Sequence, residues 1–383
     1  KMLQDAALTV IELVIELAQH GLTLQDAHPW NVLFDWSKPV YVDVGSIVPA
    51  DGNVLWPGYD EFLRFFVYPL YLFSHGHGRI ARWLLHDYYK GVLRHEVEAL
   101  THKLSLGVTV NGMAGRALKR LKRYVPSRFH AAVKRIISKA KSMTSRHSQM
   151  AQDRLQFLLK VRQKVAKIHL PSTESKWSGY YDDQWPSFSP SNEWTAKHYN
   201  VYRVLSRLQP KSLLDVGSNR GWYSQLAACN GSSVVSFDID EGCVTQLYND
   251  VKKKHLSVLP VVMDFRNPSP AYGLCNRWLS SAVDRFKCEM VLSLALVHHL
   301  VFKDYLNFHQ IVDALSLFSK RWLLVEFIPR EDTYVRQWWS ERFSWYTLDQ
   351  FIAALRRCFH SVTVFPSYPE PRVLLLCEKQ DGS

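Results

Sequence analysis

The second half of the chain carries short runs of apolar residues, each bounded by polar or turn-forming residues. Runs of this kind are typical of strands buried on both faces of a parallel sheet. Between them, apolar residues recur at helical spacing, as in 194–208 and 305–318. Strands are predicted, in chain order, at 213–216, 234–237, 259–263, 290–297, 322–327, 362–365 and 373–377. The pattern predicts an α/β fold with a seven-stranded, mostly parallel sheet and an antiparallel edge.

The first half of the chain follows a different pattern. Residues 2–20 place apolar side chains at helical spacing and are followed by Gly21, which predicts a helix. Short runs on either side of 36–38 predict a β-hairpin, and aromatic-rich helical patterns continue to residue 100. We therefore expect three parts, namely a mostly helical domain over 1–100, a basic helical connector over 101–170 and the α/β domain over 171–383.

Positive charge is concentrated in the connector. The whole chain has a net charge of +12, and residues 101–170 hold 17 Lys or Arg against one acid, Asp153. Helical patterns are predicted there at 117–124 and 129–141. A basic helical face binds phosphates or an anionic membrane, or it is the solvated side of a linker. An anionic partner, whether RNA, a membrane surface or an acidic glycan, is thus one of two interpretations.

Composition narrows the class of protein. A hydrophobic content of 47% is enough for a buried core, and no apolar window reaches the roughly 19 residues of a transmembrane segment. Six cysteines with no CxxC spacing predict reduced thiols in a cytoplasmic protein. No signal peptide is recognised, and because the first residue is Lys1, the chain is expected to begin inside a longer protein.

The first predicted strand of the sheet turns tightly into a helix. Asp215 is followed by Gly217 and Gly221. Glycines at such a turn let the backbone approach a ligand, and the new helix directs free N–H groups toward it. The dinucleotide pattern G-x-G-x-x-G is not met, because position 219 is Asn and position 222 is Trp. This argues against a nicotinamide cofactor.

Polar residues also end the next three strands. Asp238 lies 23 residues after Asp215, where a carboxylate suits the two hydroxyls of a ribose. Asp264 and Phe265 follow the third strand and suit the amino group and the ring face of adenine. The fourth run ends in His298 and His299.

These four elements, in register, resemble the class I S-adenosylmethionine-dependent methyltransferases over roughly residues 177–380. The resemblance implies a Rossmann-like methyltransferase sheet and S-adenosyl-L-methionine as cofactor. It also implies a closing segment, with Tyr180 and Tyr181 as lid candidates. The implied cofactor-binding residues are Asp215, Gly217, Ser218, Asn219, Gly221, Asp238, Ile239, Asp264, Phe265 and Ser293.

Methyl transfer requires alignment of donor and acceptor and, for a hydroxyl or a protonated amine, removal of a proton. An imidazole is suited to that step, so His298 is the predicted base, with His299 beside it. Glu326, at the end of the fifth strand, is a second candidate, either to orient that histidine or to bind the acceptor. A Glu-x-x-Glu-His arrangement is missing, since position 295 is Ala and position 298 is His, so no metal is predicted in this domain.

A second resemblance lies in the first half. Asp26 and Asn31, followed by Asp43 and Gly45, are similar to the catalytic loop and metal-binding Asp of the protein-kinase and aminoglycoside-phosphotransferase superfamily. No Gly-rich loop or strand lysine precedes them, so a pseudokinase-like remnant of the kinase C-lobe is expected rather than an active kinase. With residues 47–62, this part resembles bacterial two-part methyltransferases related to host-specific nodulation proteins.

Three functions are compatible with these patterns. The first is a methyltransferase that acts on an O or N acceptor of a small molecule, glycan or lipid-linked substrate. The second is an RNA methyltransferase tethered by the basic segment. The third is a non-catalytic cofactor-binding scaffold with a pseudokinase-like lobe. DNA base methylation is disfavoured, because the fourth strand ends in Ser293-Leu-Ala-Leu instead of the Pro-Pro-aromatic signature, and no Pro-Cys pair occurs.

Overall fold

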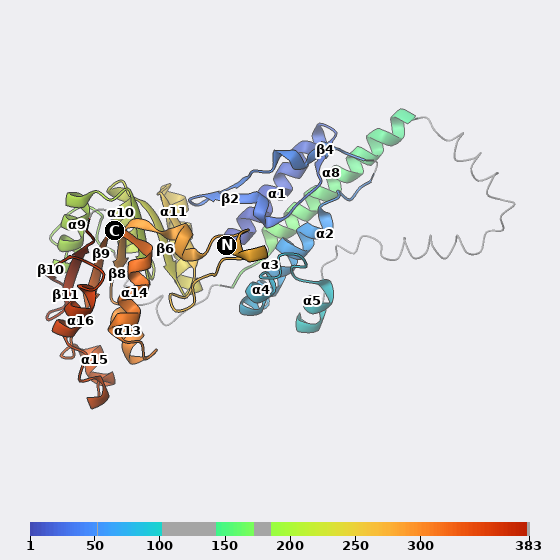
Figure 1. The fold of residues 1–383 in the computed structure, drawn as a ribbon. Coiled ribbons are helices and arrows are strands. Elements are labelled where there is room, and N and C mark those ends of the chain that lie inside the picture. The colour runs from blue at the N-terminus through green and yellow to red at the C-terminus, as the bar shows by residue number, and fades with distance from the viewer. Residues whose placement is uncertain (52, 102–142, 172–184, 381–383) are drawn as a thin grey trace. The chain divides into compact units, whose positions relative to one another are not determined.

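A computed structural model describes residues 1–51, 53–101, 143–171 and 185–380 of the chain (Figure 1). Its contacts divide the chain into two units, 1–35 with 39–171, and 172–383 with 36–38. None of the helices in the described part combines the length and apolar character that a membrane span requires. The predicted helices at 117–124 and 129–141, and the lid candidates Tyr180 and Tyr181, lie outside the described residues.

The second unit is built on a seven-stranded sheet in the order β10-β11-β9-β8-β5-β6-β7. Strands β9, β8, β5, β6 and β7 run parallel, whereas β11 is antiparallel to both of its neighbours. The predicted α/β sheet is confirmed, with the reversed strand second from the edge. The strands are β5 (Ser212–Val216), β6 (Ser233–Asp238), β7 (Val258–Val262), β8 (Cys288–Ser293), β9 (Ser319–Phe327), β10 (Ser361–Pro366) and β11 (Val373–Glu378).

Helices pack on the sheet through two apolar cores. One core joins the sheet to α9, α10 and α11, and the other joins it to α12, α13, α14, α15 and α16. Two predicted boundaries were wrong. The strand predicted over 290–297 ends earlier, and α13 begins at Val297. The helix predicted from 305 begins at Phe308, because the Asn307 side chain accepts a hydrogen bond of 3.0 Å from the Gln310 N–H and so caps α14. The helices are α9 (Ala196–Leu208), α10 (Trp222–Cys229), α11 (Glu241–Lys254), α12 (Ala282–Phe286), α13 (Val297–Phe302), α14 (Phe308–Phe318), α15 (Thr333–Trp338) and α16 (Leu348–Leu355).

The first unit is mostly helical and has its own core. Two small antiparallel pairings, β1 with β4 and β2 with β3, accompany the helices, and the second is the predicted hairpin. The elements are α1 (Met2–Gln19), β1 (Leu22–Leu24), β2 (Val32–Asp35), β3 (Lys38–Tyr41), β4 (Ile47–Pro49), α2 (Tyr59–Phe62), the π-helix η3 (Leu63–Val67), α3 (Tyr68–Ser74), α4 (Gly78–Leu84), α5 (Arg94–Thr101) and α8 (Met143–Lys167).

Helix α8 belongs to this first unit, although its charge had placed it in a separate connector over 101–170. Leu158, Val161 and Val165 lie one helical turn apart and are buried in the core that also holds the apolar side of α1. The Gln4 side chain donates hydrogen bonds to the carbonyls of Val165 and Ile168, both at 3.0 Å. The apolar stripe of α8 therefore decides its packing. Lys160, Arg162, Lys164 and Lys167 are exposed, whereas Arg154 is buried and bonded to the segment 51–53.

Candidate functional site

A cavity of about 430 Å³ lies in the second unit, where the carboxyl ends of β5, β6, β7 and β8 meet. Most of the predicted site residues line it. They are Asp215, Gly217, Ser218, Asn219, Asp238, Ile239, Asp264, Phe265, His298 and His299. Gly221, Ser293 and Glu326 are not among its lining residues. Strand ends far apart in sequence thus converge on one cavity.

The turn after β5 forms the floor of the cavity beside the sheet. Gly217 has a φ of +71°, and its N–H and that of Ser218 donate to the Phe237 carbonyl at 3.0 and 3.1 Å. A Cβ at Gly217 would lie 3.2 Å from a methyl group of Leu296. Gly221, with a φ of +69°, instead backs onto Leu247, whose methyl group a Cβ would approach to 2.5 Å. Gly217 is therefore required for the cavity, and Gly221 for the packing behind it.

Asp215 anchors the helix that follows the turn. Its carboxylate is buried and accepts a hydrogen bond of 2.5 Å from Ser224 Oγ on α10. Ser224 Oγ also lies 3.0 Å from Ser236 Oγ on β6. Burial raises the pKa of Asp215 to about 6, because the charged form loses its water. The side chain joins three elements beneath the predicted cofactor position.

Asp238 at the end of β6 holds the two turns that flank it. One carboxylate oxygen accepts from the Asn219 N–H at 2.8 Å and the other from the Asp240 N–H at 2.9 Å. Burial raises the pKa of Asp238, although these bonds favour its ionised form. The Ile239 N–H also favours the ionised form, so about one of the four or so acceptor positions of the carboxylate is left for a ligand hydroxyl.

Asp264 is held differently from Asp238. Arg266 Nε and Nη2 donate to its two oxygens at 2.9 and 2.7 Å, and the Arg266 side chain also pairs with Asp304. This guanidinium holds the pKa of Asp264 below its ordinary value. The predicted contact between Asp264 and an adenine amino group would therefore have to share the carboxylate with Arg266. Phe265 and Met263 still give this end of the cavity apolar walls.

The two histidines lie on α13 and line the same cavity. Their ring centroids are 4.1 Å apart, and the Trp338 ring lies 6.0 Å from that of His298. His298 is buried, and its Nδ1 has no hydrogen-bond partner among the described residues. Burial lowers the pKa of His298 well below its ordinary value, and burial with Lys303 lowers that of His299 to about 4. Both rings are thus neutral near pH 7 and able to accept a proton.

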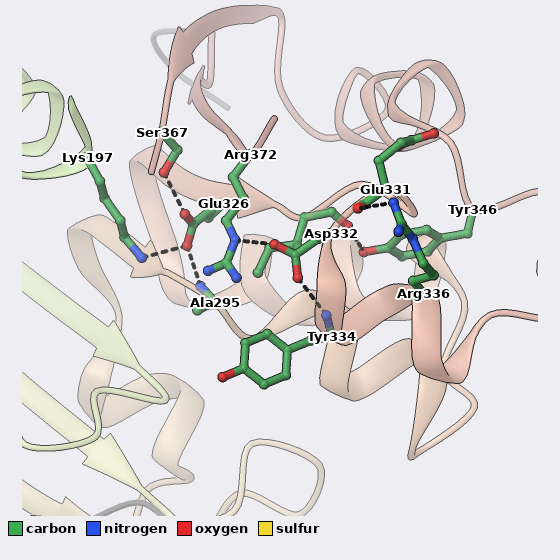
Figure 2. A network of polar contacts seen from close by, with 11 residues as sticks. Lys197, Ala295, Glu326, Glu331, Asp332, Tyr334, Arg336, Tyr346, Ser367 and Arg372 are labelled. Carbon is green, nitrogen blue, oxygen red and sulfur yellow. Dashed lines mark hydrogen bonds and ion pairs between the residues drawn. The ribbon is translucent and has the colours of Figure 1, made fainter. Parts of the chain in front are cut away.

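Glu326 was predicted either to orient a histidine or to bind the acceptor, and it lies behind the cavity wall without lining the cavity. It is fully buried, and Figure 2 shows its carboxylate held by three donors. Lys197 Nζ lies at 2.6 Å, the Ala295 N–H at 2.9 Å and Ser367 Oγ at 2.6 Å. Ala295 has a φ of +52°, so the bond to Glu326 fixes a turn that a non-glycine residue rarely adopts. That turn leads directly into α13 and its histidines.

Several lining residues carried no sequence signal. Lys197 on α9 lines the cavity and also donates a hydrogen bond to Glu326. Arg372, next to β11, lines the cavity and donates from Nε to Asp332 at 2.8 Å. Lys303 lies 4.5 Å from the centroid of the Trp338 ring. Ser293, which was predicted, is instead a buried strand residue whose hydroxyl lacks a partner in the described structure. Only the folded chain brings these cations to the histidines.

The kinase-like residues of the first unit also come together. Asn31 Nδ2 donates to Asp43 at 3.4 Å, and Asp26 accepts the His28 N–H at 2.6 Å. Burial and the neighbouring Asp26 raise the pKa of Glu61 to about 7. Across 1–51, 53–101, 143–171 and 185–380, no three His, Cys, Asp or Glu side chains form a metal-binding group.

Strand order and site together define the class of the second unit. A reversed β11 between β9 and β10, a glycine turn after β5 and an acid ending β6 are the features of the class I methyltransferase fold, as the sequence predicted. No family model matches the chain.

The chain is similar to the nodulation protein NoeA of Rhizobium meliloti (strain 1021). The two are 28% identical over 368 residues, which cover 92% of this chain and 72% of NoeA. The predicted relation to nodulation proteins is confirmed.

Two solved structures show more distant likeness. The bifunctional kinase-methyltransferase WbdD is 15% identical over 47% of this chain and 37% of its own, with a TM-score of 0.35. Magnesium protoporphyrin IX methyltransferase (ChlM) from Synechocystis PCC 6803, with bound SAH, is 14% identical over 48% of this chain and 82% of its own, also with a TM-score of 0.35. The chain spans well under half of WbdD, and likeness at this distance assigns it no activity.

Proposed function

We propose that the second unit is an S-adenosylmethionine-dependent methyltransferase that acts on an O or N acceptor of a small molecule, glycan or lipid-linked substrate. One observation carries the proposal. The Gly217 turn, Asp238 and Phe265, from the ends of three adjacent strands, line the same cavity as His298. The Gly217 turn, Asp238 and Phe265 fit a nucleoside, and His298 can accept a proton.

The residues present suit each part of the cofactor. The backbone at Gly217 permits close approach, the Asp238 carboxylate suits a ribose hydroxyl, and Met263 with Phe265 offers apolar contact to a purine. Bound S-adenosylmethionine supplies an electrophilic methyl group. The chain then has to exclude water, align the acceptor and take its proton, and the neutral imidazole of His298 is placed for the last step.

Calorimetry with S-adenosylhomocysteine tests the cofactor assignment. We expect saturable binding to the full chain, and at least about tenfold weaker binding to Asp238→Asn, since one charged acceptor is lost. Asp313→Asn, the same change at an exposed position on α14, is the matched control and should bind as the wild type does. Absence of binding to the wild type, or equal binding by both variants, would contradict the proposal.

The two alternative functions predict different results. An RNA methyltransferase would bind RNA with an affinity that falls steeply as salt is raised, because phosphate contacts release counterions. A scaffold would bind S-adenosylhomocysteine but would not convert the cofactor when small-molecule, glycan or RNA acceptors are supplied. Cofactor turnover against each acceptor class therefore separates the three functions. An anionic partner for 101–170 and a cytoplasmic location remain predictions.

A further inference from the structure

Three cationic side chains from separate elements line one end of the cavity, which we call the acceptor end. They are Lys197 on α9, Lys303 directly after α13 and Arg372 in the segment between β10 and β11. His298 and Trp338 line the same end. Cations brought together from three parts of the sequence at one wall give that wall a positive potential.

The acids that pair with two of these cations lie behind the wall. Glu326 is 0% exposed and Asp332 is 5% exposed, and neither lines the cavity. Lys197 Nζ is 2.6 Å from Glu326 and Arg372 Nε is 2.8 Å from Asp332, as Figure 2 shows. Each pair therefore points its positive member toward the cavity and its negative member away from it.

The acids that line the cavity with these cations lie on other elements or pair with another arginine. Asp215 and Asp238 lie at the carboxyl ends of β5 and β6, and Asp264 and Asp304 both pair with Arg266. Arg266 neutralises the charge of Asp264 and Asp304. The charge of Asp215 and Asp238 is directed at the nucleoside position of the proposed function.

His298 lies within reach of all three cations. Lys197, Lys303 and Arg372 each lower the pKa of His298, in addition to the effect of its burial. Its Nδ1, buried and unpartnered within the described residues, adds a hydrogen-bonding position at this end. Without an anion nearby, this imidazole is a weak base.

We infer that the methyl acceptor carries an anionic group, a carboxylate or a phosphate, that binds between Lys197, Lys303 and Arg372. The inference rests on the proposed function, which assigns this end of the cavity to the acceptor. The anion offsets the positive field around His298 and so strengthens it as a base when the substrate is in place. The acceptor atom then bonds to the methyl carbon as the carbon–sulfur bond breaks, and its proton passes to the imidazole. The sulfonium leaves as a neutral thioether.

Matched probes test the inference on the full chain saturated with S-adenosylhomocysteine. Benzoate and phenyl phosphate carry the anion, and benzamide is the neutral analogue of similar shape. We expect at least one anion to bind about tenfold or more tightly than benzamide, and the tighter of the two identifies the group. Equal binding of benzamide would overturn the inference. So would benzoate binding that disappears when S-adenosylhomocysteine is added, because the cations would then serve the carboxylate of the cofactor.

Lys303→Glu tests the site directly, because Lys303 is the exposed member of the three cations. We expect this variant to bind the preferred anion at least about fivefold more weakly. Lys320→Glu, the same change at an exposed position at the start of β9, is the matched control. Equal weakening by both variants would mean that only net charge matters, and the inference would fail.

Two further readouts complete the test. The preferred anion should raise the pKa of His298, measured from its imidazole NMR signals, while benzamide should leave it unchanged. An unchanged pKa with a bound anion would place the anion elsewhere and overturn the inference. Loss of S-adenosylhomocysteine binding by the wild type would instead refute the proposed function, so the two failures are distinguishable.

Discussion

Adjacent histidines in α13 have different surroundings at the scale of single residues. His298 is 4% exposed, with Nδ1 unpartnered in the described part of the chain, whereas His299 is less buried, and burial together with Lys303 lowers its pKa to about 4. If His298 is the base, His298→Asn should lower kcat by about a hundredfold or more and leave S-adenosylhomocysteine affinity unchanged. The same substitution at His299 is the control, with a loss below about tenfold. Similar kcat values for the two variants would remove His298 from the mechanism.

The buried carboxylate of Asp215 makes a pH-dependent contribution to stability. Its folded pKa of about 6 lies above the ordinary value of 3.8, so between these values the folded state holds the proton more tightly. Stability contributed by this residue is therefore present below about pH 4 and falls as the pH rises to about 6. Asp215→Asn removes the titration. From pH 4 to pH 7.5 the variant should gain up to about 3 kcal/mol relative to the wild type.

Urea unfolding at a series of pH values measures this difference. Asp349→Asn, an exposed change in the first turn of α16, should show no such trend. A constant difference between wild type and Asp215→Asn across the range would show that the carboxylate is not desolvated in the folded protein.

The turn between β5 and α10 is the element on which cofactor access depends. Gly217→Ala puts a methyl group 3.2 Å from Leu296 at a φ of +71°, which should cost about 1 to 2 kcal/mol in stability. Because the new methyl group enters the cavity wall, affinity for S-adenosylhomocysteine should fall at least about tenfold. Gly231→Ala has similar backbone strain, at a φ of +93°, but meets nothing within 4 Å. This control should lose stability and keep its affinity; parallel losses of affinity would show that strain alone is responsible.

The elements that the sequence predicted are those with local signals. Strand runs end in Asp215, Asp238 and His298, and parallel pairing brings such ends to one edge whatever the loops between them do. The contacts of Glu326 had no local signal, because Lys197 is 129 residues away and Ser367 is 41 residues away. A buried acid with such partners cannot be distinguished, in sequence, from one that faces the ligand.

The prediction that α8 belongs to a separate basic connector was wrong, because it was based on charge alone. Counting basic residues favours a solvated connector, but Leu158, Val161 and Val165 decide its position through burial. The sequence analysis did not identify Arg372, because a single arginine between two strands is usually a surface residue. Its partner Asp332 is 40 residues away in the sequence, so the pair has no local signal.

At the scale of the whole molecule, the two units have separate apolar cores. The cores of the first unit contain residues before 171, and those of the second contain residues after 185. Units with separate cores unfold as separate cooperative transitions unless their interface is large and apolar. The chain is therefore expected to give two transitions in scanning calorimetry.

Ligand and mutation should act on different transitions. S-adenosylhomocysteine at a hundred times its Kd should stabilise only the transition of the second unit, by about 2.7 kcal/mol, since it binds only that folded unit. Leu158→Ala, in the core shared by α1 and α8, should lower only the other transition, by about 2 to 5 kcal/mol, because removing three buried carbon atoms leaves a cavity. Asp238→Asn is the control for the ligand, because at the same ligand concentration tenfold weaker binding should reduce the shift to about 1.4 kcal/mol while both transitions remain. A single transition that moves with ligand and with Leu158→Ala alike would show that the first unit is thermodynamically part of the second.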